Sequence, residues 1–304
     1  MEPSTRPKVP ALMLSDATQS LICDVFDQPG LFRDAPRVEK RVVDWSPPQP
    51  ITLPHSAVII SEEKLSQSLR PLVPASNPTD PAPLWTIHSN PPLPPSTEHR
   101  FGTRIAAALH VPLHDTSDAT ACWIEALESG WLFMIPAAGR SAWLLTVGGP
   151  AESLLAQSRL IAPQIAAPVA ATAQFPAYPR ISDPLCASGW LACGTTAMSF
   201  DPLCGDGTGN AVREAILAAA VIRSALAGSN DVEGLLAHYR ARLRAGFYRH
   251  LEFCREFYSK GRSGPWWDQE LDHIMKGIDY CKSAMTQGLR FRYQLTGFEL
   301  QPIR

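Results

Sequence analysis

The chain has 304 residues, of which 45% are hydrophobic and 18% charged, so it is long enough to bury a large core in one or two domains. Its net charge of −2 provides no general attraction to nucleic acid or to an anionic membrane, and no apolar run approaches the length of a membrane span. Seven scattered cysteines without a C-x-x-C pair argue against a disulfide framework or a structural zinc site. We expect a cytoplasmic protein with reduced thiols, no metal site, and neither nucleic acid nor membrane as partner.

The first hundred residues are predicted to mix short helices and strands. Apolar residues recur at helical spacing or alternate, and proline clusters between 71 and 95. The predicted elements are a helix over 11–26, strands over 38–45 and 56–61, a short helix over 62–72 and a strand over 85–87.

The middle of the chain has a β pattern. Four apolar runs, over 105–112, 119–127, 131–136 and 142–147, are separated by turn residues. They predict an antiparallel sheet with one face toward the glycine loop at 205–209, as the wall of a substrate chamber. A helix is predicted over 150–165.

A strand, a glycine-rich loop and a long helix are predicted over 189–228. The apolar run 190–193 ends at Gly194, and a helix with only three charged residues, Arg213, Glu214 and Arg223, follows from about Asn210. That helix is expected to be buried nearly all round, and its positive N-terminus suits a phosphate or an electron-rich ring edge. The loop is neither a dinucleotide fingerprint nor a Walker loop. The alternative is a glycine-rich connection that only caps a core helix.

Two further helices are predicted at the C-terminal end, over 231–257 and 266–286. The segment 239–262 is rich in arginine and is followed by Trp266 and Trp267. Because glutamates interleave with the arginines, a solvated helix face is a better interpretation than a nucleic-acid surface.

The stretch WLACGTTAMSFDPLCGDGTGNAVREAI resembles the second flavin-contacting motif of the flavin-dependent monooxygenases and halogenases, the p-hydroxybenzoate hydroxylase-like flavoproteins. The resemblance implies an FAD cofactor. It also implies that the first helical residues meet the flavin edge, whereas residues 195 and 201 contact ribityl or phosphate groups. The implied cofactor-binding residues are Thr195, Asp201, Pro202, Gly205, Gly207, Thr208, Gly209 and Asn210.

The chain departs from this family in three places. Thr195 stands where the family has Asp, and Glu62 stands near an Arg that many relatives have. No strand–G-x-G-x-x-G–helix unit is found, and the resemblance covers roughly residues 8–228, as if the chain began just after that unit. FAD is therefore expected to bind weakly or to be lost. The segment 130–136 also resembles the W-x-W-x-I-P signature of halogenases, although an apolar strand ending in Pro is the favoured interpretation.

The fold class expected from these patterns is α/β, or mixed α+β. It would comprise a partial FAD-binding Rossmann-like domain over 1–100, an antiparallel substrate sheet over 101–182, and the second flavin motif with C-terminal helices over 183–304. The leading function is FAD-dependent oxidation of a small-molecule substrate, of monooxygenase or halogenase type, with no catalytic acid or base assigned. The alternatives are a degenerate, non-catalytic remnant that serves as a binding or scaffold protein, and an unrelated α+β binding protein with a coincidental loop.

Overall fold

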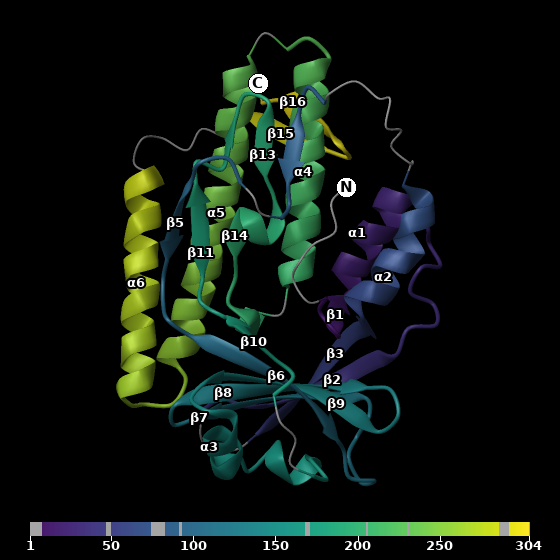
Figure 1. The fold of residues 1–304 in the computed structure, drawn as a ribbon, viewed down its shortest axis with the longest axis vertical. Helices are drawn as coiled ribbons and strands as arrows, with labels where there is room; N and C mark the ends of the chain where they lie inside the picture. The colour runs from purple at the N-terminus through teal and green to yellow at the C-terminus, as the bar shows by residue number, and fades with distance from the viewer. Residues whose placement is uncertain are drawn as a thin grey trace. The chain divides into compact units, whose positions relative to one another are not determined.

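The computed structural model describes residues 8–46, 50–73, 83–90, 93–167, 171–204, 206–229, 231–285 and 292–303. The chain divides into two compact units, each assembled from three separate stretches. Unit 1 comprises Met1–Val73, Gly102–Tyr178 and Cys254–His273, and unit 2 comprises Pro74–Phe101, Pro179–Phe253 and Ile274–Arg304. The mixed α/β class with C-terminal helices is confirmed (Figure 1).

Unit 1 contains an eight-stranded mixed sheet with the order β1-β3-β2-β7-β8-β9-β6-β10. Its strands are β1 (Leu12–Ser15), β2 (Arg37–Asp44), β3 (Ile51–Ile60), β6 (Ile105–Pro112), β7 (Ala121–Leu127), β8 (Gly130–Ala137), β9 (Ser141–Gly148) and β10 (Ala173–Pro176). Its helices are α1 (Asp16–Phe26), α2 (Glu62–Leu69) and α3 (Ala151–Gln157), with the 3-10 turns η1 (Arg70–Leu72) and η2 (Ala162–Gln164).

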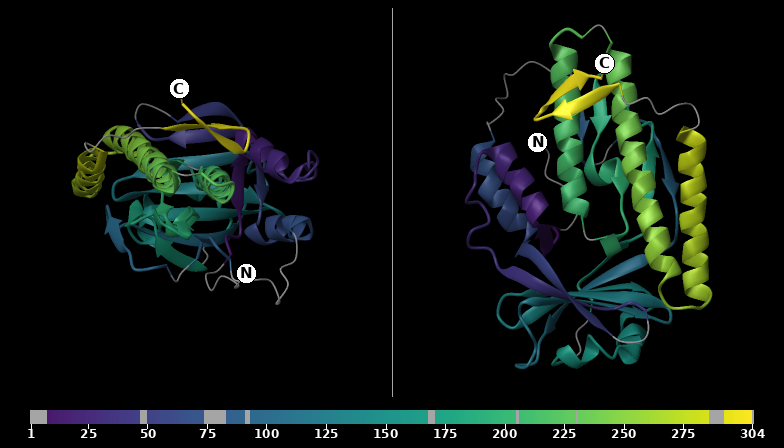
Figure 2. Two further views of the ribbon diagram at one scale, coloured as in Figure 1. Left: turned by 90° about the horizontal axis from the view of Figure 1, so that it is seen from above. Right: turned by 180° about the vertical axis from the view of Figure 1, so that it is seen from behind.

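The predicted antiparallel pairing of the central strands is confirmed. β7 pairs with β8, β8 with β9, and β9 with β6, all antiparallel. The sheet is nevertheless mixed, because β2 pairs in parallel with β7 and brings the N-terminal strands into the same sheet. One face packs Leu132, Met134 and Leu144 against residues that include Leu154 of α3. The right-hand view of Figure 2 shows the ribbon of α3 next to this sheet. The opposite face carries a second cluster around Cys122.

Unit 2 contains small sheets and the central helix. Its strands are β4 (Thr86–His88), β5 (Thr97–Arg100), β11 (Arg180–Asp183), β12 (Cys186–Ala187), β13 (Trp190–Ala192), β14 (Met198–Ser199), β15 (Tyr293–Thr296) and β16 (Glu299–Pro302). The turns η3 (Gly194–Thr196) and η4 (Pro202–Cys204) precede α4 (Gly207–Leu226). The unit boundaries at Cys254 and Ile274 fall within α5 (Val232–Ser259) and α6 (Pro265–Met285), which confirm the two predicted C-terminal helices.

Burial of α4 differs from the expectation. Ile216, Leu217 and Val221 are buried, but Ala219 and Leu226 are exposed, so the helix is not buried all round. The sequence did not reveal that one side of this helix is exposed, because alanine occurs in both buried and exposed positions. In the part of the chain that the structure describes, no helix has both the length and the apolar character needed to cross a bilayer.

Two predicted helices are wrong in their extent. The helix expected over 11–26 begins only at Asp16, because β1 occupies Leu12–Ser15 and the Ser15 hydroxyl accepts the Thr18 N–H as an N-cap. The helix expected over 150–165 ends at Gln157. The chain then turns around a buried carboxylate from β7.

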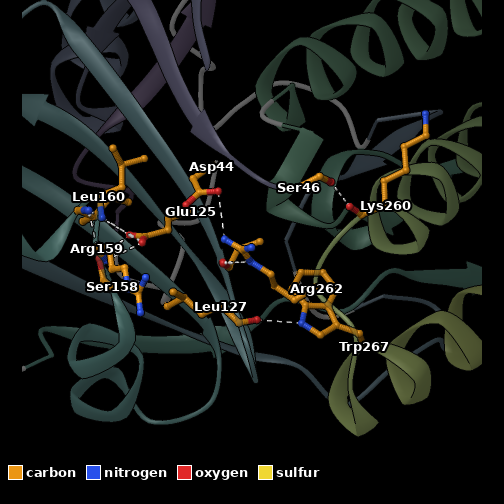
Figure 3. A network of polar contacts seen from close by, with 12 residues as sticks. Asp44, Ser46, Glu125, Leu127, Ser158, Arg159, Leu160, Lys260, Arg262 and Trp267 are labelled. Atoms are coloured by element: carbon orange, nitrogen blue, oxygen red, sulfur yellow. Dashed lines mark hydrogen bonds and ion pairs between the residues drawn. The ribbon is translucent and has the colours of Figure 1, made fainter. Parts of the chain in front are cut away.

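That carboxylate belongs to Glu125, which is 2% exposed. It accepts the backbone N–H groups of Arg159, Leu160 and Ile161 at 2.7–3.0 Å, together with the Ser158 hydroxyl (Figure 3). Backbone donors that would continue the helix are thus directed to a side chain of the sheet. The same view shows Arg262 bonded to Asp44 and the Trp267 indole N–H donating to the Leu127 carbonyl.

Replacing Glu125 with Gln should destabilise the protein by about 2–4 kcal/mol, because hydrogen bonds to a charged group contribute about 1.5–3 kcal/mol each and the new NH₂ group faces N–H donors. Thermal and urea unfolding measure the change. The control is Glu152→Gln on the exposed surface of α3, which should change stability by no more than about 0.5 kcal/mol. Equal effects of the two substitutions would contradict this assignment.

Candidate functional site

The predicted strand–loop–helix arrangement over 189–228 is confirmed. β13 lies in a three-stranded sheet, parallel to β4 and antiparallel to β12. Leu191, Ala192 and Cys193 are buried, and the chain then passes through η3, β14 and η4 into the N-terminus of α4 (Figure 1). All of these elements belong to unit 2. Of the predicted site residues, Gly205 lies outside the described residues.

The turn η3 is held by side chains from two other elements. The Gly194 N–H donates to Glu214 Oε2 of α4 at 2.8 Å. From β11, the Arg180 guanidinium donates to the Thr195 carbonyl at 3.3 Å, and the Ser182 hydroxyl donates to the Thr196 carbonyl at 2.9 Å. Gly194 itself has φ +62°, a conformation that favours glycine. The result is a fixed turn on which Thr195 remains exposed.

Glu214 is the buried acid of this site, with 6% of its surface exposed. Burial raises the pKa of Glu214 to about 7, and the hydrogen bond from Gly194 only partly offsets this rise. Burial also raises the pKa of Cys193 to about 12 and that of Tyr239 well above its ordinary value, with Glu214 contributing to both. The Tyr239 hydroxyl donates to the Ala192 carbonyl at 2.6 Å. Glu214 is therefore the group in this cluster that titrates near neutral pH.

The first turn of α4 faces open space at its start. A Cβ atom added at Gly207 meets no other atom within 4 Å, and Gly207 has no left-handed φ, so packing does not require glycine there. Asp206 does not cap the helix with its side chain, because Arg213 holds that carboxylate at 2.9 Å. The initial N–H groups of a helix lack intrahelical acceptors and form the positive end of its dipole. Thr208, Gly209 and Asn210 lie in this turn.

Asp201 and Pro202 shape the approach to α4. Asp201 is 2% exposed, and its carboxylate accepts the Leu203 N–H at 2.8 Å. The Asp201 N–H donates to His250 Nε2 at 2.9 Å, and Pro202 begins η4. The Asp201 side chain is thus engaged within the chain, where it stabilises the turn between β14 and α4.

Several residues that build this site carry no motif in the sequence. In the sequence, Glu214 stands out as a lone acid in an apolar helix, but no local pattern identifies the Gly194 N–H as its hydrogen-bond partner. Arg180, Ser182 and His250 come from β11 and α5, and no local pattern connects them to the turn. Among the described His, Cys, Asp and Glu side chains, no group of three is placed to hold a metal ion.

The halogenase-like segment forms β8, in the interior of the unit 1 sheet. Trp131 is fully buried, its indole N–H donates to the Tyr258 hydroxyl at 3.1 Å, and its ring centroid lies 6.4 Å from that of Trp45. Phe133 lies on the same face but is only partly buried. The segment is an apolar strand whose Trp belongs to the aromatic core.

Comparisons with known proteins agree with this architecture. No protein-family profile matches the chain, and the comparison with curated proteins found no match to it. The solved structure of the peptidyl tryptophan dihydroxylase QhpG, essential for tryptophylquinone cofactor biogenesis, matches with a TM-score of 0.71 and 17% identity, over 88% of this chain and 71% of that one. CmlS, a flavin-dependent halogenase, matches with a TM-score of 0.71 and 15% identity, over 95% of this chain and 66% of its own. The myxobacterial chondrochloren halogenase CndH matches with a TM-score of 0.69 and 13% identity, over 98% and 86%.

These likenesses define the class of fold. The chain has the fold of the flavin-dependent halogenases and FAD-dependent hydroxylases and monooxygenases, as the resemblance of residues 190–216 implied. The matched region spans just under two thirds of the length of CmlS and about seven tenths of QhpG.

Stability should fall as pH rises through 7, because Glu214 has a pKa of about 7 in the folded chain, above its ordinary value of 4.5. Its contribution is fully present below pH 4.5 and is lost above pH 7, with a maximum of about 3 kcal/mol. His238, with a pKa lowered to about 4, acts in the opposite direction at lower pH, so the test compares two proteins. The difference in melting temperature between wild type and Glu214→Gln, measured from pH 5 to 8.5, should change between pH 5 and about 7 and then level off. A constant difference would exclude this role for Glu214.

Proposed function

We propose that the chain binds FAD at η3 and the N-terminus of α4, and that it acts as an FAD-dependent oxidoreductase of monooxygenase or halogenase type on a small organic molecule. The observation that carries the proposal is the pairing of a fixed turn, which exposes Thr195, with a helix start that is open at Gly207. Gly207 is the first residue of α4, and the absence of a side chain there would leave room for a planar ring.

The residues present fit a flavin. The N–H groups of Gly207, Thr208 and Gly209 would donate to the electron-rich edge of the ring, where the helix dipole favours negative charge. The Asn210 N–H already donates to the Asp206 carbonyl at 3.0 Å, so Asn210 would contribute through its position in this turn. The Thr195 hydroxyl would bond a ribityl hydroxyl or a phosphate. Asp201 and Pro202 would act through the shape of the turn, because the Asp201 carboxylate is already engaged by Leu203. Bound flavin would supply the redox chemistry, and these residues would bind it, orient it and exclude water.

We expect the affinity for FAD to be low. Thr195 provides a neutral hydrogen bond where a carboxylate would provide a charge-assisted one, a difference of about 1.4 kcal/mol or tenfold in affinity. No G-x-G-x-x-G motif occurs in the sequence to hold the pyrophosphate at a second helix N-terminus. Glu62, at the start of α2, accepts the Val9 N–H at 2.8 Å and brings no positive charge for a phosphate.

Gly207→Ala should weaken FAD binding at least about tenfold while leaving stability unchanged or raising it by up to about 1 kcal/mol, because the methyl group enters open space next to the helix N-terminus. FAD titration followed by flavin fluorescence measures affinity, and thermal unfolding measures stability. The control is Gly246→Ala in α5, where an added Cβ also meets nothing within 4 Å. It should affect stability in the same direction and leave FAD affinity unchanged.

Thr195→Asp should raise FAD affinity about tenfold by restoring a charge-assisted hydrogen bond to a sugar hydroxyl. Thr195→Asn, of matched size but neutral, should not. Both are measured by the same titration in low salt. Equal affinities of the two variants would argue that Thr195 does not contact the cofactor.

The alternative, a folded remnant without cofactor, predicts a different pattern. A purified chain that is colourless and folded, and whose fluorescence titration shows no binding of FAD or riboflavin, would contradict the proposed function. Stoichiometric, tightly bound FAD would instead overturn the low-affinity expectation and leave the enzyme proposal standing.

A further inference from the structure

Three tryptophans of unit 1 form a continuous line of ring contacts. Trp45 follows β2, whereas Trp266 and Trp267 lie in the first turn of α6. The ring centroids of Trp45 and Trp267 are 5.4 Å apart, and those of Trp267 and Trp266 are 4.9 Å apart, both edge to face. Rings at these separations are in direct contact. An electron can therefore pass from one ring to the next without crossing a gap.

The line of rings leads from the aromatic core to the surface. Trp131 is fully buried, and its centroid lies 6.4 Å from that of Trp45. Trp45 is 8% exposed and Trp267 is 2% exposed, whereas Trp266 is partly exposed. A positive charge on a buried ring costs more free energy than the same charge on a ring in contact with water. A radical cation formed on this line would therefore be most stable at Trp266.

Hydrogen bonds favour a positive charge on the two buried rings while it passes. The Trp45 indole N–H donates to the Phe257 carbonyl at 2.8 Å, and the Trp267 indole N–H donates to the Leu127 carbonyl at 2.9 Å (Figure 3). Removing an electron from an indole ring makes its N–H a more strongly charged donor, and hydrogen bonds from charged donors are stronger. The two carbonyl groups thus offset part of the cost of charge in the core.

Tyr258 lies beside this line but is a poorer place for a positive charge. Its ring centroid is 5.5 Å from that of Trp267, and the Arg104 guanidinium lies 4.9 Å from the Tyr258 centroid. Arg104 is 2% exposed and forms an ion pair with Glu270. A cation near a ring face is attracted to the electrons of that ring, so it opposes their removal. The positive charge would therefore follow the tryptophans.

Glycines hold the outer rings in place. A Cβ atom added at Gly261 would lie 2.5 Å from Cζ3 of Trp267, and one added at Gly148 would lie 2.9 Å from Cζ2 of Trp266. The absence of a side chain lets the backbone lie directly against each ring. The spacing between the rings is thus fixed by close packing.

We propose that Trp45, Trp267 and Trp266 form an electron relay that removes oxidising equivalents from the aromatic core. The oxidant is an oxygen-centred radical, such as a peroxyl radical, which takes one electron from Trp45 and becomes a peroxide anion. The Trp45 radical cation takes an electron from Trp267, which in turn takes one from Trp266.

The relay is restored at its exposed end. The Trp266 radical cation gives its indole proton to water, and a thiol then donates a hydrogen atom to the neutral Trp266 radical. Two thiyl radicals formed in this way combine as a disulfide. This function goes beyond the proposed cofactor site and does not depend on it, because the radical can come from solution.

The test injects the oxidising equivalent next to Trp45. Ser46 is exposed and directly follows Trp45, so Ser46→Cys provides a thiol for a ruthenium tris-bipyridyl maleimide. The full chain carries Cys23→Ser and Cys204→Ser as well, so that the label reacts at the new thiol. A laser flash in the presence of a cobalt(III) ammine generates ruthenium(III), which takes one electron from Trp45. Transient visible absorption measures the yield and lifetime of the tryptophan radical, with and without glutathione.

Three variants of the labelled chain separate the steps. Trp45→Phe should reduce the radical yield to a small fraction. Trp266→Phe should keep the yield but lengthen the radical lifetime in glutathione at least about tenfold, the effect of a barrier raised by about 1.4 kcal/mol, because the thiol cannot reach the buried rings. Trp266→Tyr keeps an oxidisable ring and should restore most of the reaction with glutathione. The matched control is Trp143→Phe, whose ring contacts His110, and it should behave like the parent chain.

Melting temperatures show whether each variant is folded, and the two Trp266 variants keep the test decisive if Trp45→Phe is not. A parent chain that forms no tryptophan radical would overturn the proposal. So would a Trp45→Phe variant with the parent's yield, or a Trp266→Phe variant whose radical reacts with glutathione as fast as the parent's. Since no flavin takes part in these measurements, their outcome is independent of the proposed function.

Discussion

The candidate site depends on one hydrogen bond, from the Gly194 N–H to the buried carboxyl group of Glu214. It joins the turn after β13 to the second turn of α4, so the two parts of the site are held by the same side chain. Arg180 and Ser182 complete the support from the other side. Because this turn is already fixed before a ligand binds, presenting Thr195 to a ligand would cost little additional conformational entropy.

Buried carboxyl groups organise both units by accepting backbone donors. Glu125 takes three consecutive N–H groups and a hydroxyl, and it ends α3 where the amphipathic pattern alone would continue it. Glu214 takes a single N–H group, and burial therefore raises its pKa to about 7. Both acids thus fix a turn of the chain by accepting backbone N–H groups.

The two units differ in the groups that their elements bring together. Unit 2 offers backbone donors and a helix dipole, which suit an electron-rich ring edge or a phosphate. Unit 1 contains a sheet with a buried apolar cluster on each face. The similarity to the halogenase and hydroxylase folds extends over both units, because it covers 88–98% of the chain.

The sequence by itself determined the elements whose signals are local. The strands β6 to β9, the turns at Gly130 and Gly139, and the α4 stop at Gly228 follow from periodicity and from backbone conformations that glycine tolerates. Tertiary structure alone decided that β1 replaces the start of a helix, that Glu125 ends α3, and that β2 joins the central sheet in parallel. It also decided that Glu214 would be buried beside the turn at Gly194. The environment of a charged side chain is set by residues distant in sequence, and local patterns hold no information about them.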